Sequence, residues 1–174
     1  MLGMARPAEH RQQLIRYAIG VVVLAALGLG FFWYRQHQAG VRQDALRVAI
    51  RTQEAQVGQA QSALAVSFAT AEEKDKAVAK AWQDLISKYS GSMEAQIAHY
   101  YLGINAADKG NISEAEKQFR TVVDSGKAVY ASQAKLALAR IYESTGKTAE
   151  AEKLLRSLVS DPTILVSKEQ ATLL

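Results

Sequence analysis

The residue types that support catalysis or metal binding are few and widely spaced in this sequence of 174 residues. The three histidines, His10, His37 and His99, lie too far apart to suggest one metal site, and no His-Glu-x-x-His motif occurs. The sequence contains no cysteine, which excludes disulfides, thiolate catalysis and iron–sulfur sites within it. No nucleophile is paired with a base. We therefore expect no enzyme, no metal site and no cofactor.

One short motif resembles a phosphate-binding loop. Gly146-Lys147-Thr148 matches the end of the pattern G-x4-G-K-[ST], but Ile141 stands where the first glycine belongs. The pattern also requires a preceding strand, and none is expected here. A turn between two helices is the simpler interpretation, and nucleotide binding is not expected.

Composition points to an all-α protein that does not bind nucleic acid. The only prolines are Pro7 and Pro162, and Ala, Gln, Glu, Lys, Arg and Leu, which favour helices, dominate between them. The net charge of +4 is a mild excess, without the clustered Lys and Arg of a nucleic-acid interface. Hydrophobic residues make up 49% of the chain, which is enough for a packed core.

An uncharged apolar block, residues 17–34, follows a basic tail at residues 1–16. As a helix it would span about 27 Å, close to the hydrocarbon thickness of a bilayer. Aromatic rings and cations are typical of both membrane interfaces. The expected interface anchors are Tyr17, Trp33, Tyr34 and Arg35. The block therefore predicts one transmembrane helix in contact with the lipid bilayer.

Two other interpretations of the block remain open. A cleaved signal peptide has a shorter apolar region followed by small residues, whereas the bulky segment Phe31–Arg35 fills that place here. A buried core helix would need other elements to cover all of its faces. The basic residues on the two flanks are nearly equal in number, so charge alone does not orient the helix.

Residues 35–71 are expected to continue the anchor as a long linker helix. Their apolar residues recur at helical spacing, at Leu46, Ile50, Val57, Ala60, Leu64 and Phe68. This stripe could also form a coiled-coil seam and make the protein a homo-oligomer, although polar Gln53 interrupts it.

Residues 72–174 contain an internal repeat. Residues 72–89 predict one amphipathic helix, and a shift of 36 residues then superimposes two later segments. The matched pairs are Leu102 with Leu138, Gly110 with Gly146, Glu114–Lys117 with Glu150–Lys153, and Arg120 with Arg156. A fixed period of this length predicts stacked helix pairs. We place the repeats at about 96–129 and 132–163, with partial repeats at both ends, and expect the C-terminus to be that of a fragment.

These segments resemble the tetratricopeptide repeat family. Leu102-Gly103 and the spacing Ala115-x3-Phe119 match its pattern, and Tyr142 matches its tyrosine position in the second copy. The resemblance implies an α-solenoid of helix hairpins that binds proteins along a concave groove. If the register holds, the groove is lined by Ile97, Tyr100, Ile104, Asp108, Gln133, Leu136, Arg140 and Glu143. Alternatively, Tyr100 and Ile104 merely pack on the preceding helix.

The whole layout resembles the ancillary subunit of the SecYEG translocon in bacterial envelopes, and the segment Trp33–Gln38 resembles the one that follows the anchor in that family. The resemblance implies a single-pass inner-membrane protein with a cytoplasmic N-terminus and a periplasmic repeat domain. It implies a membrane-tethered adaptor whose partners are translocon subunits or periplasmic chaperones. The alternative is a self-associating envelope scaffold without a translocon role.

Overall fold

The computed structural model describes residues 7–58, 66–126 and 128–172, and the described chain is all-α apart from two short strands. Its contacts divide it into two compact units, with the boundary between Val41 and Arg42. The predicted fold class, an N-terminal helix able to span a membrane followed by a helical repeat domain, is confirmed. Each unit is described separately below.

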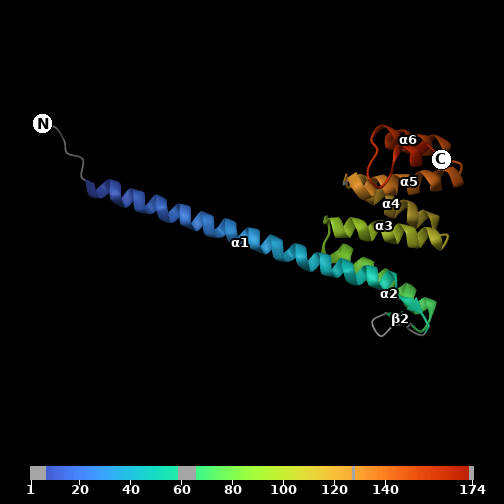
Figure 1. Cartoon of the computed structure of the whole chain (residues 1–174), viewed down its shortest axis with the longest axis horizontal. Helices are drawn as coiled ribbons and strands as arrows, with labels where there is room; N and C mark the ends of the chain where they lie inside the picture. The colour runs from blue at the N-terminus through green and yellow to red at the C-terminus, as the bar shows by residue number, and fades with distance from the viewer. Residues whose placement is uncertain (1–6, 59–65, 127, 173–174) are drawn as a thin grey trace. The chain divides into compact units, whose positions relative to one another are not determined.

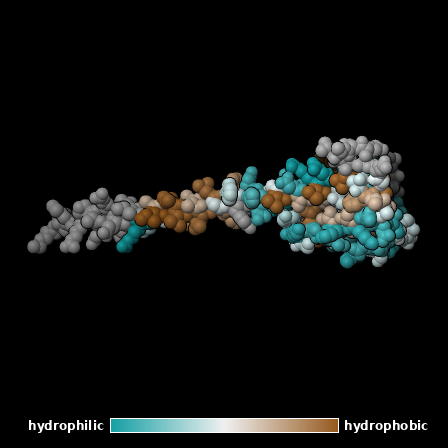
Figure 2. Space-filling model, turned by 90° about the horizontal axis from the view of Figure 1, so that it is seen from below, coloured by the Kyte–Doolittle hydropathy of each residue, from teal (hydrophilic) through white to brown (hydrophobic). Residues whose placement is uncertain are grey.

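The first unit consists of the N-terminal part of α1 (Pro7–Gln53). Its apolar side chains are uncovered, with exposed fractions of 74% at Tyr17 and 72% at Trp33. Figure 2 shows them as a brown, hydrophobic surface along this helix. Within the described residues, α1 is the one helix long and apolar enough to cross a membrane. The side chains of the expected anchors Tyr34 and Arg35 lie outside the described residues.

The second unit begins with the last turns of α1, which pack on α2 (Ala71–Lys88). Ala49 is only 1% exposed and joins a buried cluster with Val78, Trp82 and Leu85. Leu46 and Ile50 pack against the same cluster. The C-terminal part of α1 is therefore a packing element of the repeat domain.

The predicted long linker helix over residues 35–71 is wrong, because α1 ends at Gln53. After that residue the backbone forms β1 (Gln56–Val57), which pairs in parallel with β2 (Ser67–Phe68). Backbone hydrogen bonds between these strands replace the helical ones that residues 56–58 would otherwise make. The predicted helical stripe is thus divided between α1 and the strands, and Ala60 and Leu64 lie outside the described residues.

A hydrogen-bonded triad of Gln53, Trp82 and Asn105 joins the end of α1 to α2 and α3. Gln53 Oε1 accepts hydrogen bonds from Trp82 Nε1 at 2.9 Å and from Asn105 Nδ2 at 3.0 Å. Gln53 Nε2 donates to Asn105 Oδ1 at 3.0 Å. Because the Trp82 side chain is buried and both amides are partly buried, these bonds satisfy polar groups that would be costly to leave unpaired.

From α2 onward, each helix packs on the next one along the chain. Figure 1 shows this succession from α2 to α6. The remaining helices are α3 (Met93–Asp108), α4 (Ile112–Asp124), α5 (Ala128–Ser144), α6 (Thr148–Ser160) and α7 (Lys168–Thr172). A shift of 36 residues carries the bounds of α4 onto those of α6, as the sequence repeat predicts.

Local sequence explains where these helices begin and turn. The side chains of Thr70, Ser92 and Asn111 accept a backbone N–H in the first turns of α2, α3 and α4, respectively. Gly110 and Gly146 adopt φ values of 73° and 78° in the turns within the two repeats, a conformation that glycine accepts without steric cost.

Candidate protein-binding surface

The predicted groove residues come from α3 and α5, two helices that contact each other directly. Aromatic rings form the seam between them. The ring of Tyr100 on α3 lies 5.8 Å from that of Tyr130 on α5 and 5.7 Å from that of Phe119 on α4. Tyr101 stacks on Trp82 at 4.8 Å. The ring of Tyr100 thus packs on α4 and α5, whereas it is Tyr101 that packs on α2. Tyr100 is half-buried, and its place in a binding groove stays a prediction.

The four predicted groove residues of α3 lie at different depths. Ile97 is buried in the cluster around Trp82, so its side chain is not accessible to a partner. Ile104 is partly buried and packs on the cluster around Phe119. Asp108 is exposed in the last turn of α3.

The four predicted residues of α5 are also divided. Leu136 packs against a small C-terminal cluster, whereas Gln133 is half-buried, and Arg140 and Glu143 are exposed. The structure thus leaves Asp108, Arg140 and Glu143 open to solvent, with Tyr100 and Gln133 partly so. The assignment of these side chains to a binding groove stays a prediction.

The electrostatics of the seam favour a neutral aromatic surface beside one cation. Burial raises the pKa of Tyr100, the nearby Tyr101 and Tyr130 raise it further, and Arg140 opposes the shift. Burial likewise raises the pKa of Tyr130. Both phenols are therefore neutral at physiological pH and can act as hydrogen-bond donors.

Tyr130 was not among the predicted groove residues, although it completes the aromatic seam. It precedes the expected start of the second repeat at 132, and Glu94 occupies the corresponding position 36 residues earlier. No repeat signal therefore marks it. Glu94 itself is almost buried and forms an ion pair with Arg42 of α1, with 3.4 Å between Nε and the carboxylate oxygen.

A polar network joins α4 to the following repeat. Arg120 donates from Nε and Nη2 to Tyr142 Oη at 3.0 and 2.8 Å, and Tyr142 Oη donates to Glu116 at 3.2 Å. Lys147 Nζ donates to the other oxygen of Glu116 at 3.2 Å and lies 5.1 Å from the centre of the Tyr142 ring. We call these four residues the repeat clamp.

The pKa values in the repeat clamp follow from these contacts. Partial burial opposes ionisation of Glu116, but the hydrogen bond from Lys147, the charges of Arg120 and Lys147, and the hydroxyl of Tyr142 outweigh it, so the pKa of Glu116 is lowered. The hydrogen bond to Tyr142 is the main cause of the raised pKa of Arg120. Glu116 and Arg120 are therefore both charged at neutral pH.

The same network explains the phosphate-loop motif. Gly146 makes the turn, Lys147 binds the carboxylate of Glu116, and Thr148 begins α6. The ammonium group of Lys147 is thus paired with a carboxylate of the protein itself. Among the residues that the structure describes, no three His, Asp or Glu side chains gather as a metal site would require. His99 Nδ1 lies 2.6 Å from Gln118 Oε1, a contact between α3 and α4.

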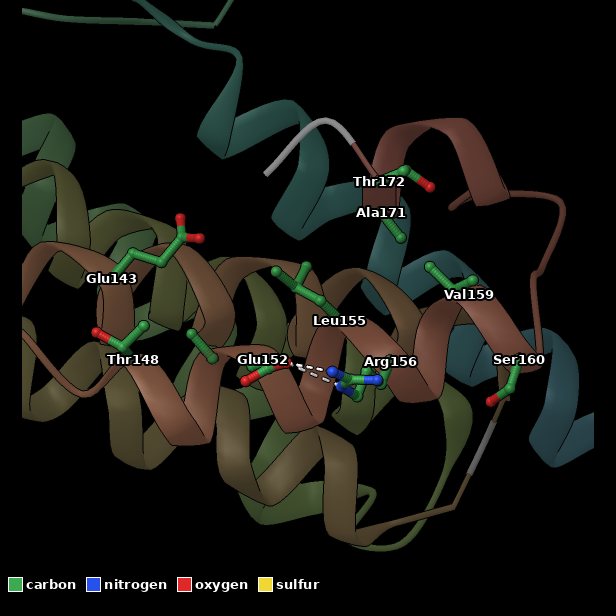
Figure 3. Close-up of a pocket in the computed structure, with 10 residues that line it drawn as sticks. Glu143, Thr148, Glu152, Leu155, Arg156, Val159, Ser160, Ala171 and Thr172 are labelled. Atoms are coloured by element: carbon green, nitrogen blue, oxygen red, sulfur yellow. Dashed lines mark hydrogen bonds and ion pairs between the residues drawn. The ribbon is translucent and has the colours of Figure 1, made fainter.

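A hollow of about 710 Å³ lies between α6 and α7. Figure 3 shows Glu152, Leu155, Arg156 and Val159 along one side of it, with Ala171 and Thr172 of α7 nearby. Glu143, the last predicted groove residue of α5, also lines it. No motif in the sequence marks this hollow.

Comparison with known proteins is consistent with this architecture. No curated protein and no solved structure matches the chain significantly. A family model described as a tetratricopeptide repeat-like domain matches residues 12–162, which is most of the sequence. The chain therefore belongs to the tetratricopeptide repeat-like domain family.

Proposed function

We propose that this protein is a membrane-tethered adaptor for protein–protein interaction. Domains of its family generally bind other proteins and typically act as non-catalytic scaffolds. The observation that carries the tether is the uncovered apolar surface of α1 in the same chain as the repeats. Tethering would hold the repeat domain at the membrane and raise its effective concentration near partners there.

The cellular setting is part of the proposal. The order of basic tail, apolar helix and repeats, together with the segment Trp33–Gln38, supports a single-pass protein of the bacterial inner membrane with a periplasmic repeat domain. The same resemblance supports translocon subunits or periplasmic chaperones as partners. The contact surface would be the α3/α5 face with its aromatic seam and Arg140.

Site-specific photo-crosslinking of the membrane-bound protein in its native host tests this proposal. A photoreactive residue at exposed Arg140 should form adducts with translocon subunits or periplasmic chaperones, identified by mass spectrometry. The matched control is Lys117, which is exposed on α4 and belongs to neither α3 nor α5. Adducts only with cytoplasmic proteins would reverse the topology and overturn the translocon role.

The self-associating scaffold is a less supported alternative. Its proposed seam was the helical stripe from Leu46 to Phe68, but α1 ends at Gln53, and Leu46 and Ile50 pack against the core. A mass that increases with protein concentration in detergent, together with crosslinks from Arg140 only to the protein itself, would favour this alternative.

A further inference from the structure

The boundary where α3 packs on α2 can be compared with the one where α5 packs on α4. A shift of 36 residues carries Leu102-Gly103 of α3 onto Leu138-Ala139 of α5. A shift of 37 residues carries the buried residues of α2 onto those of α4, namely Val78, Trp82 and Leu85 onto Ala115, Phe119 and Val122. The first boundary, α2 with α3, is therefore the counterpart of the second boundary, α4 with α5.

At the second boundary, the repeat clamp joins α4 to α5. Tyr142 is only 5% exposed, and its hydroxyl is hydrogen-bonded to Glu116 and Arg120 of α4. The ammonium group of Lys147 lies 5.1 Å from the centre of the tyrosine ring. One aromatic ring with a polar end therefore fills this boundary.

At the first boundary, the four positions of the clamp hold smaller or uncharged residues. The residues that correspond to Glu116, Arg120, Tyr142 and Lys147 are Ala79, Gln83, Ala106 and Asn111. All four line a hollow of about 660 Å³ between α2, α3 and α4, which we call the α2/α3 hollow. Ala106 stands at the tyrosine position of the family's repeat pattern, three residues after Gly103. The α2/α3 hollow thus lies where a tyrosine ring lies at the second boundary.

The α2/α3 hollow also contains an unused hydrogen-bond acceptor. Because a carboxylate only accepts, Nε2 of Gln118 donates to Glu114 at 2.6 Å, and Oε1 of Gln118 faces His99. Nδ1 of His99, 2.6 Å from that oxygen, must then carry the proton. In the neutral imidazole, Nε2 is consequently an acceptor, and it makes no hydrogen bond within the described residues. Ile86 and Leu102 add apolar surface to the same hollow.

We propose that the α2/α3 hollow binds a tyrosine side chain of a partner protein. The ring would lie over Ala106, against Ile86 and Leu102, and its hydroxyl would donate to Nε2 of His99. Gln83, which also lines the hollow, is exposed, so the site opens to solvent. The inference is independent of the membrane tether and of the α3/α5 face, because neither the aromatic seam nor Arg140 lines this hollow.

N-acetyl-L-tyrosinamide serves as the probe for the full-length protein in detergent micelles at mildly alkaline pH. Isotope-labelled histidine reports on His99 by NMR, and His99→Gln identifies its signal. We expect a saturable shift of the Nε2 signal, and about fivefold weaker binding of N-acetyl-L-phenylalaninamide, which lacks the hydroxyl. Ala106→Tyr should abolish binding, because its own ring would occupy the hollow.

Urea denaturation of the same variant tests whether the hollow has room for a ring. Ala106→Tyr should not lower the urea midpoint of the protein. Ala107→Tyr is the matched control, since Ala107 is also partly buried on α3 but does not line the hollow. This control should lower the midpoint, because the added ring overpacks the contact between helices.

Photo-crosslinking from Gln83 in the native host tests the source of the tyrosine. Adducts should map to a tyrosine-containing segment of another protein and should disappear in Ala106→Tyr. Adducts only with this chain would assign the hollow to a second copy and overturn the partner protein.

Three further results would overturn the inference. The first is a His99 signal that the probe does not shift, and the second is equal binding of the tyrosine and phenylalanine probes. The third is a urea midpoint that falls as far in Ala106→Tyr as in Ala107→Tyr, since the hollow would then have no room for a ring.

Discussion

Gly103 lies against the ring of Phe119, with no space for a side chain. A Cβ atom at this position would be 2.7 Å from Cε1 of the ring, and Phe119 is itself buried. Gly103→Ala should therefore force α3 and α4 apart and lower the free energy of unfolding by about 1–3 kcal/mol. Urea denaturation of the protein in detergent, followed by circular dichroism, measures this loss.

A second substitution tests whether the loss of stability in Gly103→Ala comes from the clash with the Phe119 ring. Phe119→Leu shortens the group that the new methyl would meet, so the double variant should lose less stability than the sum of the two single losses. Gly40→Ala, in open space on α1, should not lower the stability of the repeat domain. If Gly103→Ala were as stable as the parent, this result would contradict the close contact between Gly103 of α3 and Phe119 of α4.

Glu116 makes the stability of the repeat domain depend on pH. Because its pKa in the folded protein is lowered from the ordinary value of 4.5, the unfolded chain binds its proton more tightly than the folded one does. The clamp's contribution is therefore present above pH 4.5 and is lost as the pH falls through the lower folded pKa. Glu116→Gln should flatten the fall in stability between about pH 5 and pH 3.

The matched control for this pH dependence is Glu150→Gln, a substitution of an exposed glutamate in the first turn of α6. Urea midpoints at several pH values compare the parent with both variants. If the urea midpoint fell equally steeply at acidic pH in the parent and in Glu116→Gln, the role assigned to this carboxylate would be contradicted.

At the scale of elements, the end of α1 acts as a helix of the repeat domain. Ala49 is 1% exposed against α2, whereas its neighbour Val48 is 61% exposed. Ala49→Asp should unfold much of the domain or lower its stability by more than about 3 kcal/mol, since it buries an unpaired charge. Val48→Asp should change stability by less than about 0.5 kcal/mol. Limited proteolysis and thermal denaturation distinguish the two variants.

Much of the helical arrangement follows from local sequence. The 36-residue period, the glycine turns and the apolar spacing of residues 72–89 predict the helices that the structure shows as α2 to α6. The end of α1 at Gln53 could not be predicted in this way, because the residues that follow it also favour helix. The helix ends because β1 pairs with β2 and because the Gln53 side chain is hydrogen-bonded to Trp82 and Asn105.

The candidate surface was harder to predict than the fold, for a related reason. α3 is packed between α2 and α4 and also touches α5, so apolar residues occur on several of its faces. Periodicity then cannot distinguish buried Ile97 from half-buried Tyr100, which lies three positions later. The seam with Tyr130 and the hollow beside α6 depend on contacts between helices, which no single segment encodes.

At the scale of the whole molecule, the exposed apolar part of α1 predicts integration into a membrane. Leu24→Arg combined with Leu27→Arg places two charges in the middle of the predicted span, each costing about 3 kcal/mol. The double variant should be extracted from membranes by alkaline carbonate, whereas the parent should remain in the pellet. Val41→Arg, beyond the predicted span at residues 17–34, is the control and should remain membrane-bound.

The triad at the end of α1 also has a consequence for synthesis of the chain. Gln53 and Asn105 are 52 residues apart, and Trp82 lies between them in sequence. At translation rates of about 5–20 residues per second, synthesis of these 52 residues takes about 3–10 seconds. During this time the apolar side of α1 around Ala49 lacks the helices that cover it in the folded protein. Throughout this interval a newly made chain carries an uncovered hydrophobic stripe directly behind its apolar N-terminal helix. The nascent protein therefore most needs shielding from aggregation at this stripe, before any repeat is complete.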